Sequence, residues 1–187
     1  MPAVLVLLAP WLAASPIAAG EPLAPPAFFY IQPDPASPVS TGALGVSGDG
    51  STVVGLFADD ALGWAGYRFS PSSGFATTFV PSSPPVAATA SAATFDGEMV
   101  VGGDGIEAHY WAPATGAVPI GVLPGGNERT SAQDVSADGS VIVGWAENGN
   151  GTEAFRWTSA TGLVGLGDLP GGSFYSCLLY TSPSPRD

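Results

Sequence analysis

The sequence predicts an all-β chain made of repeated units of four short antiparallel strands, arranged as a partial β-propeller of about three blades. The first observation is an Asp-Gly turn that recurs at Asp49, Asp96 and Asp138, with separations of 47 and 42 residues. The second is that each turn is followed by a β-branched run ending in Gly and later by an aromatic run. Periods of about 40–50 residues with four strands each are typical of propeller blades.

Residues 133–172 form the most regular copy and show why each element is expected. Asp-Gly and Asn-Gly pairs favour tight turns, while β-branched and aromatic runs between them favour strands. In the third strand, Phe155 and Trp157 should share one face and Arg156 the other, because side chains alternate. The predicted strands of this copy cover 133–136, 140–145, 153–158 and 163–169, with turns at 137–139, 148–151 and 159–162.

Twelve residues define the repeat, and we interpret them as structural. They are the Asp and Gly of each turn, a glycine that closes each β-branched run, two strand tryptophans and one later turn glycine: Asp49, Gly50, Gly55, Asp96, Gly97, Gly102, Trp111, Asp138, Gly139, Gly144, Trp157 and Gly162. The predicted repeats cover 41–85, 86–126 and 127–172, and a fourth repeat starts before residue 176. Three blades are fewer than a closed ring needs, so we expect an open arc with apolar end faces.

The first twenty residues are interpreted as a secretory signal peptide. Ala3 to Leu8 is an apolar core, and small residues precede Glu21 as at a cleavage site. The n-region carries no Lys or Arg, so a start inside a longer signal peptide and a misassigned start remain alternatives. Residues 21–40 are Pro-rich and predicted to be a linker, in which 27–31 could add an edge strand to a blade or form a loop with packed aromatics.

The last eleven residues, 177–187, break the repeat pattern. They match, in order, the translation of a transposase adapter used in sequencing libraries, so we expect that they are not encoded by the natural gene. The alternative is a genuine exposed Pro/Ser tail. The single cysteine, Cys177, lies in this segment. The remainder therefore offers no disulfide framework and no thiol chemistry.

The charge balance argues against a nucleic-acid partner. The chain has a formal net charge of −12 and only four basic residues, Arg68, Arg129, Arg156 and Arg186. Binding to a phosphate backbone needs clustered Lys and Arg. No transmembrane segment is expected in the mature fragment.

Few side chains are candidates for catalysis, metal binding or ligand binding. Asp49, Asp96 and Asp138 could supply calcium ligands, but the Gly after each favours turn chemistry. His109, the sole histidine, could be an acid, base or metal ligand, yet it occupies a position held by Tyr67 and Phe155 in the other copies, which favours packing. Arg68 and Arg156 share another position, where they could bind carboxylates or stack on aromatics, and we favour exposed strand residues. We expect no catalytic residue and no cofactor.

The motifs resemble those of the HAF-type extracellular repeat family of bacteria. The residues that carry the resemblance are 135–140 with 142–144, 153–157 with 161–162, and 166–172, and the likeness extends over about 41–176. It implies a secreted or cell-surface repeat protein, propeller-like, with no catalytic motif to transfer. We therefore expect a binding or scaffold module for an extracellular ligand or surface component. The alternatives are a fragment of an extracellular propeller hydrolase or lyase whose active site is missing, and a surface-anchored structural protein.

Overall fold

The computed structural model describes residues 40–83, 86–125, 129–167 and Ser176, together with two short strands, β1 (Val6–Leu7) and β2 (Phe28–Phe29). These two strands pair with each other, antiparallel, and not with any of the larger sheets. The rest of the predicted signal peptide and most of the Pro-rich stretch lie outside the described residues. So do residues 177–187, which we interpret as adapter sequence.

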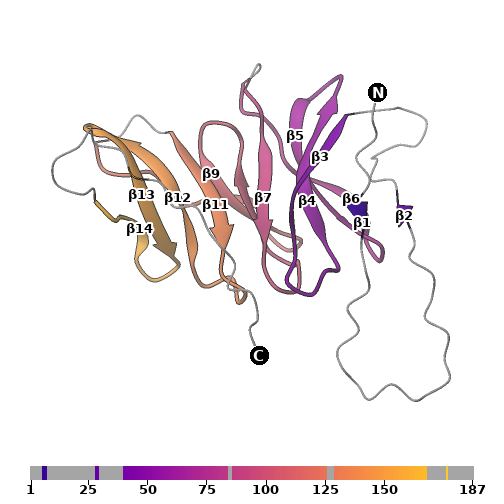
Figure 1. The fold of residues 1–187 in the computed structure, drawn as a ribbon. Coiled ribbons are helices and arrows are strands. Elements are labelled where there is room, and N and C mark those ends of the chain that lie inside the picture. Colours follow the sequence, from indigo (N-terminus) through magenta and orange to yellow (C-terminus); the bar gives the residue numbers. More distant parts are fainter. Residues whose placement is uncertain are drawn as a thin grey trace, which may run out of the picture.

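Three four-stranded antiparallel sheets stand side by side, as blades do in a propeller (Figure 1). Each sheet keeps its strands in chain order, so neighbouring strands are joined by short turns. Blade 1 contains β3 (Thr41–Val46), β4 (Val53–Asp59), β5 (Gly63–Ser70) and β6 (Gly74–Phe79). Blade 2 contains β7 (Thr89–Ala93), β8 (Val100–Gly103), β9 (Ala108–Ala112) and β10 (Gly116–Pro119). Blade 3 contains β11 (Thr130–Val135), β12 (Ile142–Asn148), β13 (Gly151–Thr158) and β14 (Gly162–Gly165).

The prediction of four-stranded all-β units is confirmed, with shifted strand ends. Strand β11 begins at Thr130, three residues before the predicted start, because its pairing with β12 extends to Ala146. Strand β14 ends at Gly165, earlier than the predicted 169. Leu166 still donates to the carbonyl of Ala154, but Gly167 then adopts a φ of 77°, which turns the chain away from the sheet.

Two neighbouring valines explain how the middle blade is buried on both faces. We call the contact between blades 1 and 2 seam 1, and that between blades 2 and 3 seam 2. Val100 packs in the core of seam 1, while its neighbour Val101 points the other way and packs in seam 2. Both side chains are fully buried. Full burial of an aliphatic side chain stabilises by about 1.5–3 kcal/mol, so this pair attaches the middle blade to both neighbours.

A glycine closes each valine-rich run because the adjacent strand comes too close for a side chain. The first strand of every blade carries a β-bulge, between Ala43 and Gly45, Ala90 and Ala92, and Ala132 and Asp134. At Gly55, Gly102 and Gly144, a Cβ atom would overlap the carbonyl oxygen of Gly42, Thr89 or Ser131 in the bulged strand. These three repeat-defining glycines therefore follow from close backbone approach.

A hydroxyl group and a backbone bond connect blades 2 and 3 to the element that follows each, whereas blade 1 has only the backbone bond, from Ala88 to the carbonyl of Trp64. In seam 2, Thr130 donates its N–H to the carbonyl of Ile106, and its Oγ1 accepts from the N–H of Ala108 at 2.7 Å. Ser176 makes the same pair of contacts with Thr152 and Ala154, again with a spacing of 22 residues for the hydroxyl bond. Ser176 thus occupies on blade 3 the place that Thr130 occupies on blade 2.

The two end faces of the arc differ. On blade 3, Leu166 is 53% exposed, although its counterpart Ile120 is 6% exposed in seam 2. This agrees with the predicted apolar end face. On the outer side of blade 1, a cluster around Val53, Phe57 and Tyr67 is buried, but Val46, which pairs with Val53 on the same face, is 56% exposed.

Within the described ranges, no helix has the length and apolar character needed to cross a membrane.

Candidate functional site

The three Asp-Gly turns share one hydrogen-bonding plan. In each, the Asp Oδ1 accepts from a hydroxyl two residues earlier: Ser47 to Asp49 at 2.6 Å, Thr94 to Asp96 at 2.7 Å and Ser136 to Asp138 at 2.6 Å. The same oxygen accepts from the backbone N–H two residues later, at 2.9–3.1 Å. The following Gly adopts a φ of 69–73°, which favours glycine. The carboxylates therefore hold the turns in shape.

These hydrogen bonds also lower the pKa values of the three carboxylates. The pKa of Asp138 is lowered to about 2 by the Ser136 hydroxyl, the Ser140 N–H and the Ser140 hydroxyl. The pKa of Asp96 is lowered by the Glu98 N–H and the Thr94 hydroxyl. Burial acts to raise the pKa of Asp49, but hydrogen bonds from Ser47 and Ser51 outweigh it and lower the value. Each turn thus presents a negative charge at neutral pH.

The turns of adjacent blades are hydrogen-bonded to one another. Asp49 donates its N–H to the carbonyl of Phe95 at 2.9 Å, and Phe95 donates its N–H to the carbonyl of Ala137 at 3.0 Å. Residues 47–50, 94–97 and 136–139 therefore form one continuous surface, which we call the turn row. The sequence pattern predicts the individual turns, but the bonds between them appear only in the folded chain.

The structure does not assemble a metal cluster from these residues. Among the described residues, no group of three or more His, Cys, Asp or Glu side chains is placed to hold a metal ion. Calcium binding at Asp49, Asp96 or Asp138 stays a prediction from the sequence.

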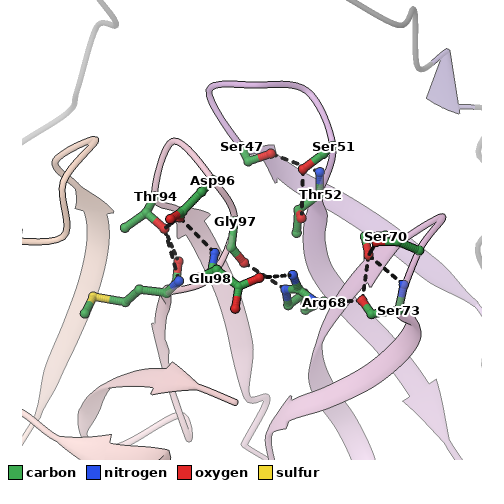
Figure 2. A network of polar contacts seen from close by, with 12 residues as sticks. Ser47, Ser51, Thr52, Arg68, Ser70, Ser73, Thr94, Asp96, Gly97 and Glu98 are labelled. Atoms are coloured by element: carbon green, nitrogen blue, oxygen red, sulfur yellow. Dashed lines mark hydrogen bonds and ion pairs between the residues drawn. The ribbon is translucent and has the colours of Figure 1, made fainter. Parts of the chain in front are cut away.

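Arg68 is the best-connected polar side chain of seam 1 (Figure 2). It is 6% exposed, so our interpretation of it as an exposed strand residue is wrong. Its Nε donates to the carbonyl of Gly97 at 2.8 Å, and its terminal nitrogens donate to the Ser73 hydroxyl at 2.7 Å and to Glu98 at 3.3 Å. The side chain crosses from blade 1 to the Asp-Gly turn of blade 2.

The equivalent residues in the other two blades behave differently. Strand register places Tyr110 and Arg156 at the position of Arg68, opposite Val101 and Val143. Tyr110 packs against Trp157, with ring centroids 5.7 Å apart. Arg156 is exposed, as predicted. Only seam 1 is therefore crossed by a guanidinium in the described part of the chain.

His109 lies in a packing position. Register aligns it with Gly102, as Tyr67 aligns with Gly55 and Phe155 with Gly144. Its Nδ1 lies 2.9 Å from the carbonyl oxygen of Glu107, and its ring centroid is 6.3 Å from that of Phe79. The first contact lies within blade 2 and the second crosses seam 1 to blade 1, so together they orient the ring at the seam.

Seam 2 contains a hollow of about 370 Å³ beside the turn row, which we call the seam-2 groove. It is lined by the exposed carboxylates Asp96, Glu98 and Asp138 and by apolar side chains that include Met99, Ala112 and Ala137. Smaller residues explain why it is open. Ala137 stands where blade 2 has Phe95, and Ala112 stands where blade 1 has Ser70.

Comparisons with known proteins support the fold. No family model matches the chain, and no curated protein matches it. The fold is similar to that of TolB from Acinetobacter baumannii, with a TM-score of 0.50 and 15% identity over 75% of this chain. A TolB-type structure from Agrobacterium tumefaciens gives a TM-score of 0.49 and 13% identity over 72% of this chain.

The chain is a partial β-propeller. It spans 33% of the length of the first of these structures and 52% of the second. At these identities the likeness concerns the fold alone.

Proposed function

We propose that the chain is a secreted or cell-surface module of the HAF-type repeat family that binds or scaffolds an extracellular partner through its turn row. The observation that carries this proposal is the continuity of the turn row across three blades, given by the bonds Asp49 to Phe95 and Phe95 to Ala137. Loops placed by a rigid scaffold are where proteins concentrate binding residues.

Three properties support a binding role for the turn row. Its residues belong to tight turns whose shape is set by internal hydrogen bonds, so little ordering is needed on binding. Its carboxylates are charged at neutral pH, as aspartates ordinarily are, and the hydrogen bonds within the turns lower the pKa values of Asp96 and Asp138 further. It borders the seam-2 groove, which adds apolar surface to the polar turns.

Export is the first part of the test. Residues 1–40, which contain the predicted signal peptide, are fused to a phosphatase reporter that is active only outside the cytoplasm. We expect reporter activity, and its loss when Leu5 and Leu7 are both changed to Arg, because a charged h-region is not exported. An inactive unmodified fusion would contradict the secreted location.

Binding is the second part. The labelled chain is applied to an array of extracellular polysaccharides and peptides, and the hits are repeated with Ser51→Arg/Ser140→Arg, which alters exposed positions beside the turn row. The matched control is Ala61→Arg/Asn150→Arg, which adds the same charge at exposed hairpin turns between the second and third strands. We expect only the first pair to abolish the hits. Equal effects of both pairs would contradict the turn row as the binding surface.

A further inference from the structure

Seam 1 shows how this fold holds a guanidinium group between two blades. Arg68 bridges the Gly97 carbonyl of the next blade, the Ser73 hydroxyl of its own blade and the Glu98 carboxylate (Figure 2). Its side chain is 8% exposed and that of Glu98 is 63% exposed, so the positive charge is buried while its carboxylate partner remains in water. Blade 1 supplies the arginine, and blade 2 supplies two of its three acceptors.

Seam 2 keeps most of these acceptors but lacks the arginine. Gly139 follows Asp138 as Gly97 follows Asp96, and it has the same positive φ. Thr115 stands in the place of Ser73, directly before the turn glycine Gly116. Tyr110 replaces Arg68 and is directed to Trp157. In the part of the chain that the structure describes, no side chain donates to the Gly139 carbonyl as Arg68 does to that of Gly97.

The seam-2 groove lies at this place and matches the chemistry of an arginine side chain. Apolar residues such as Met99, Ala112 and Ala114 offer a surface for the aliphatic stem. Asp96 and Asp138 add exposed carboxylates beside the Gly139 backbone. A planar guanidinium can donate to a carbonyl and a carboxylate together, whereas an ammonium acts as a point charge. The net charge of −12 attracts basic partners over a longer range.

We propose that the seam-2 groove binds an arginine side chain presented by a basic segment of a partner protein, in the way that seam 1 holds Arg68. The proposal rests on the proposed function and names the class of partner that the turn row would take. A metal ion is a poorer occupant, because each turn Asp already uses Oδ1 to accept hydrogen bonds within its turn.

The experiment is a titration of the ¹⁵N-labelled full chain with acetyl-Gly-Arg-Gly-amide, followed by NMR. Matched peptides carry citrulline, which is nearly isosteric but neutral, or lysine in place of arginine. We expect amide shifts confined to residues 94–99, 112–116 and 137–140, which line the groove, and weaker binding of both control peptides. Shifts elsewhere, no shifts, or equal shifts with citrulline would overturn the proposal.

Two variants and a control locate the site. Ala114→Trp places a large side chain at an exposed position in the groove and should abolish the shifts while the rest of the spectrum stays folded. Asp138→Asn keeps the turn acceptor but removes the charge, and should weaken binding about three- to fivefold, as loss of an exposed charge pair does. Asp59→Asn is the same change in the β4–β5 hairpin, outside the turn row, where the Asp Oδ1 likewise accepts backbone N–H bonds, from Ala61 and Leu62, and it should leave binding unchanged. Equal weakening by both Asn variants would overturn the assignment.

A failure of the arginine site can be distinguished from a failure of the proposed binding function. If the chain is exported and the array hits depend on the turn row, but the arginine peptide does not bind, the arginine site alone is wrong. If the array gives no hit that depends on the turn row, the binding function itself fails, whatever the peptide shows.

Discussion

The Nε atom of Arg68 in blade 1 donates a 2.8 Å hydrogen bond to the carbonyl oxygen of Gly97 in blade 2. The two residues are 29 positions apart in the chain and belong to different repeats. Gly97 adopts a positive φ as part of its own Asp-Gly turn, and this conformation presents its carbonyl to the neighbouring blade. The turn of one repeat is thus also an acceptor for a side chain of the preceding repeat, so a local turn contributes to the contact between blades.

Replacing Arg68 by Ala should destabilise the chain by about 2 kcal/mol, because three hydrogen bonds and a buried alkyl stem are lost. The ion pair with Glu98 contributes little of this, since Glu98 is 63% exposed and screened by water. Urea unfolding followed by tryptophan fluorescence measures the change.

Arg156→Ala is the matched control, because it removes the same residue type at the same repeat position where the side chain is exposed. It should change the free energy of unfolding by less than about 0.5 kcal/mol. Similar losses in both variants would show that the seam-1 network does not carry the effect.

Gly102→Ala should destabilise by about 3 kcal/mol or more, because the new Cβ would overlap the carbonyl oxygen of Thr89 at the bulge of β7. Gly149→Ala is the control, since a Cβ there meets only the Gly125 carbonyl oxygen at 3.5 Å, an ordinary contact. Thermal unfolding by circular dichroism compares the two. A Gly102 variant as stable as the Gly149 variant would disprove the close-approach explanation.

Acid should destabilise the chain partly through Asp138. Its folded pKa, about 2, lies below its ordinary value, so its contribution is complete above about pH 4 and is lost as the pH falls towards 2. Asp138→Asn should therefore flatten the fall in unfolding free energy over this interval, measured by urea titrations at several pH values.

Asp134 should change the free energy of unfolding with pH in the opposite direction. Burial raises its pKa above the ordinary value, so its contribution is present below that value and is lost as the pH rises through the folded pKa. Asp134→Asn should therefore steepen the loss of stability on acidification in that range. If Asp138→Asn and Asp134→Asn changed the pH dependence of the unfolding free energy in the same direction, the assigned pKa shifts would be contradicted.

One substitution should act in opposite directions at two buried threonines. Thr130→Val removes the acceptor of the Ala108 N–H in seam 2 and should cost about 1–3 kcal/mol. Thr78 is 5% exposed, and its Oγ1 has no hydrogen-bond partner among the described residues. Thr78→Val should therefore stabilise by about 1 kcal/mol. Chemical denaturation tests both, with Thr130→Ser as the control that keeps the acceptor; loss of stability in both Val variants would contradict the inferred hydrogen bonding.

The fold was largely predictable because turns and strand patterns are local signals. Asp49, Asp96 and Asp138 mark the same turn three times, and the structure shows the four-stranded blades that their spacing predicts. Strand ends were less predictable, as at β14, where tertiary pairing and not propensity decides the last residue. The candidate site was less predictable still. The burial of Arg68 depends on a turn 29 residues away, and the groove depends on the small size of Ala112 and Ala137 across a seam.

The bonds made by Thr130 and Ser176 have a consequence for how such genes can change. The backbone N–H of each residue donates to the preceding blade, as that of Ala88 does at seam 1, so blades 2 and 3 each carry the donor of one joint and the acceptor of the next. A duplication of one whole repeat in the gene would therefore insert a blade whose two joints already fit. A deletion of part of a repeat would instead leave an unmatched joint, because each repeat contacts only its neighbours.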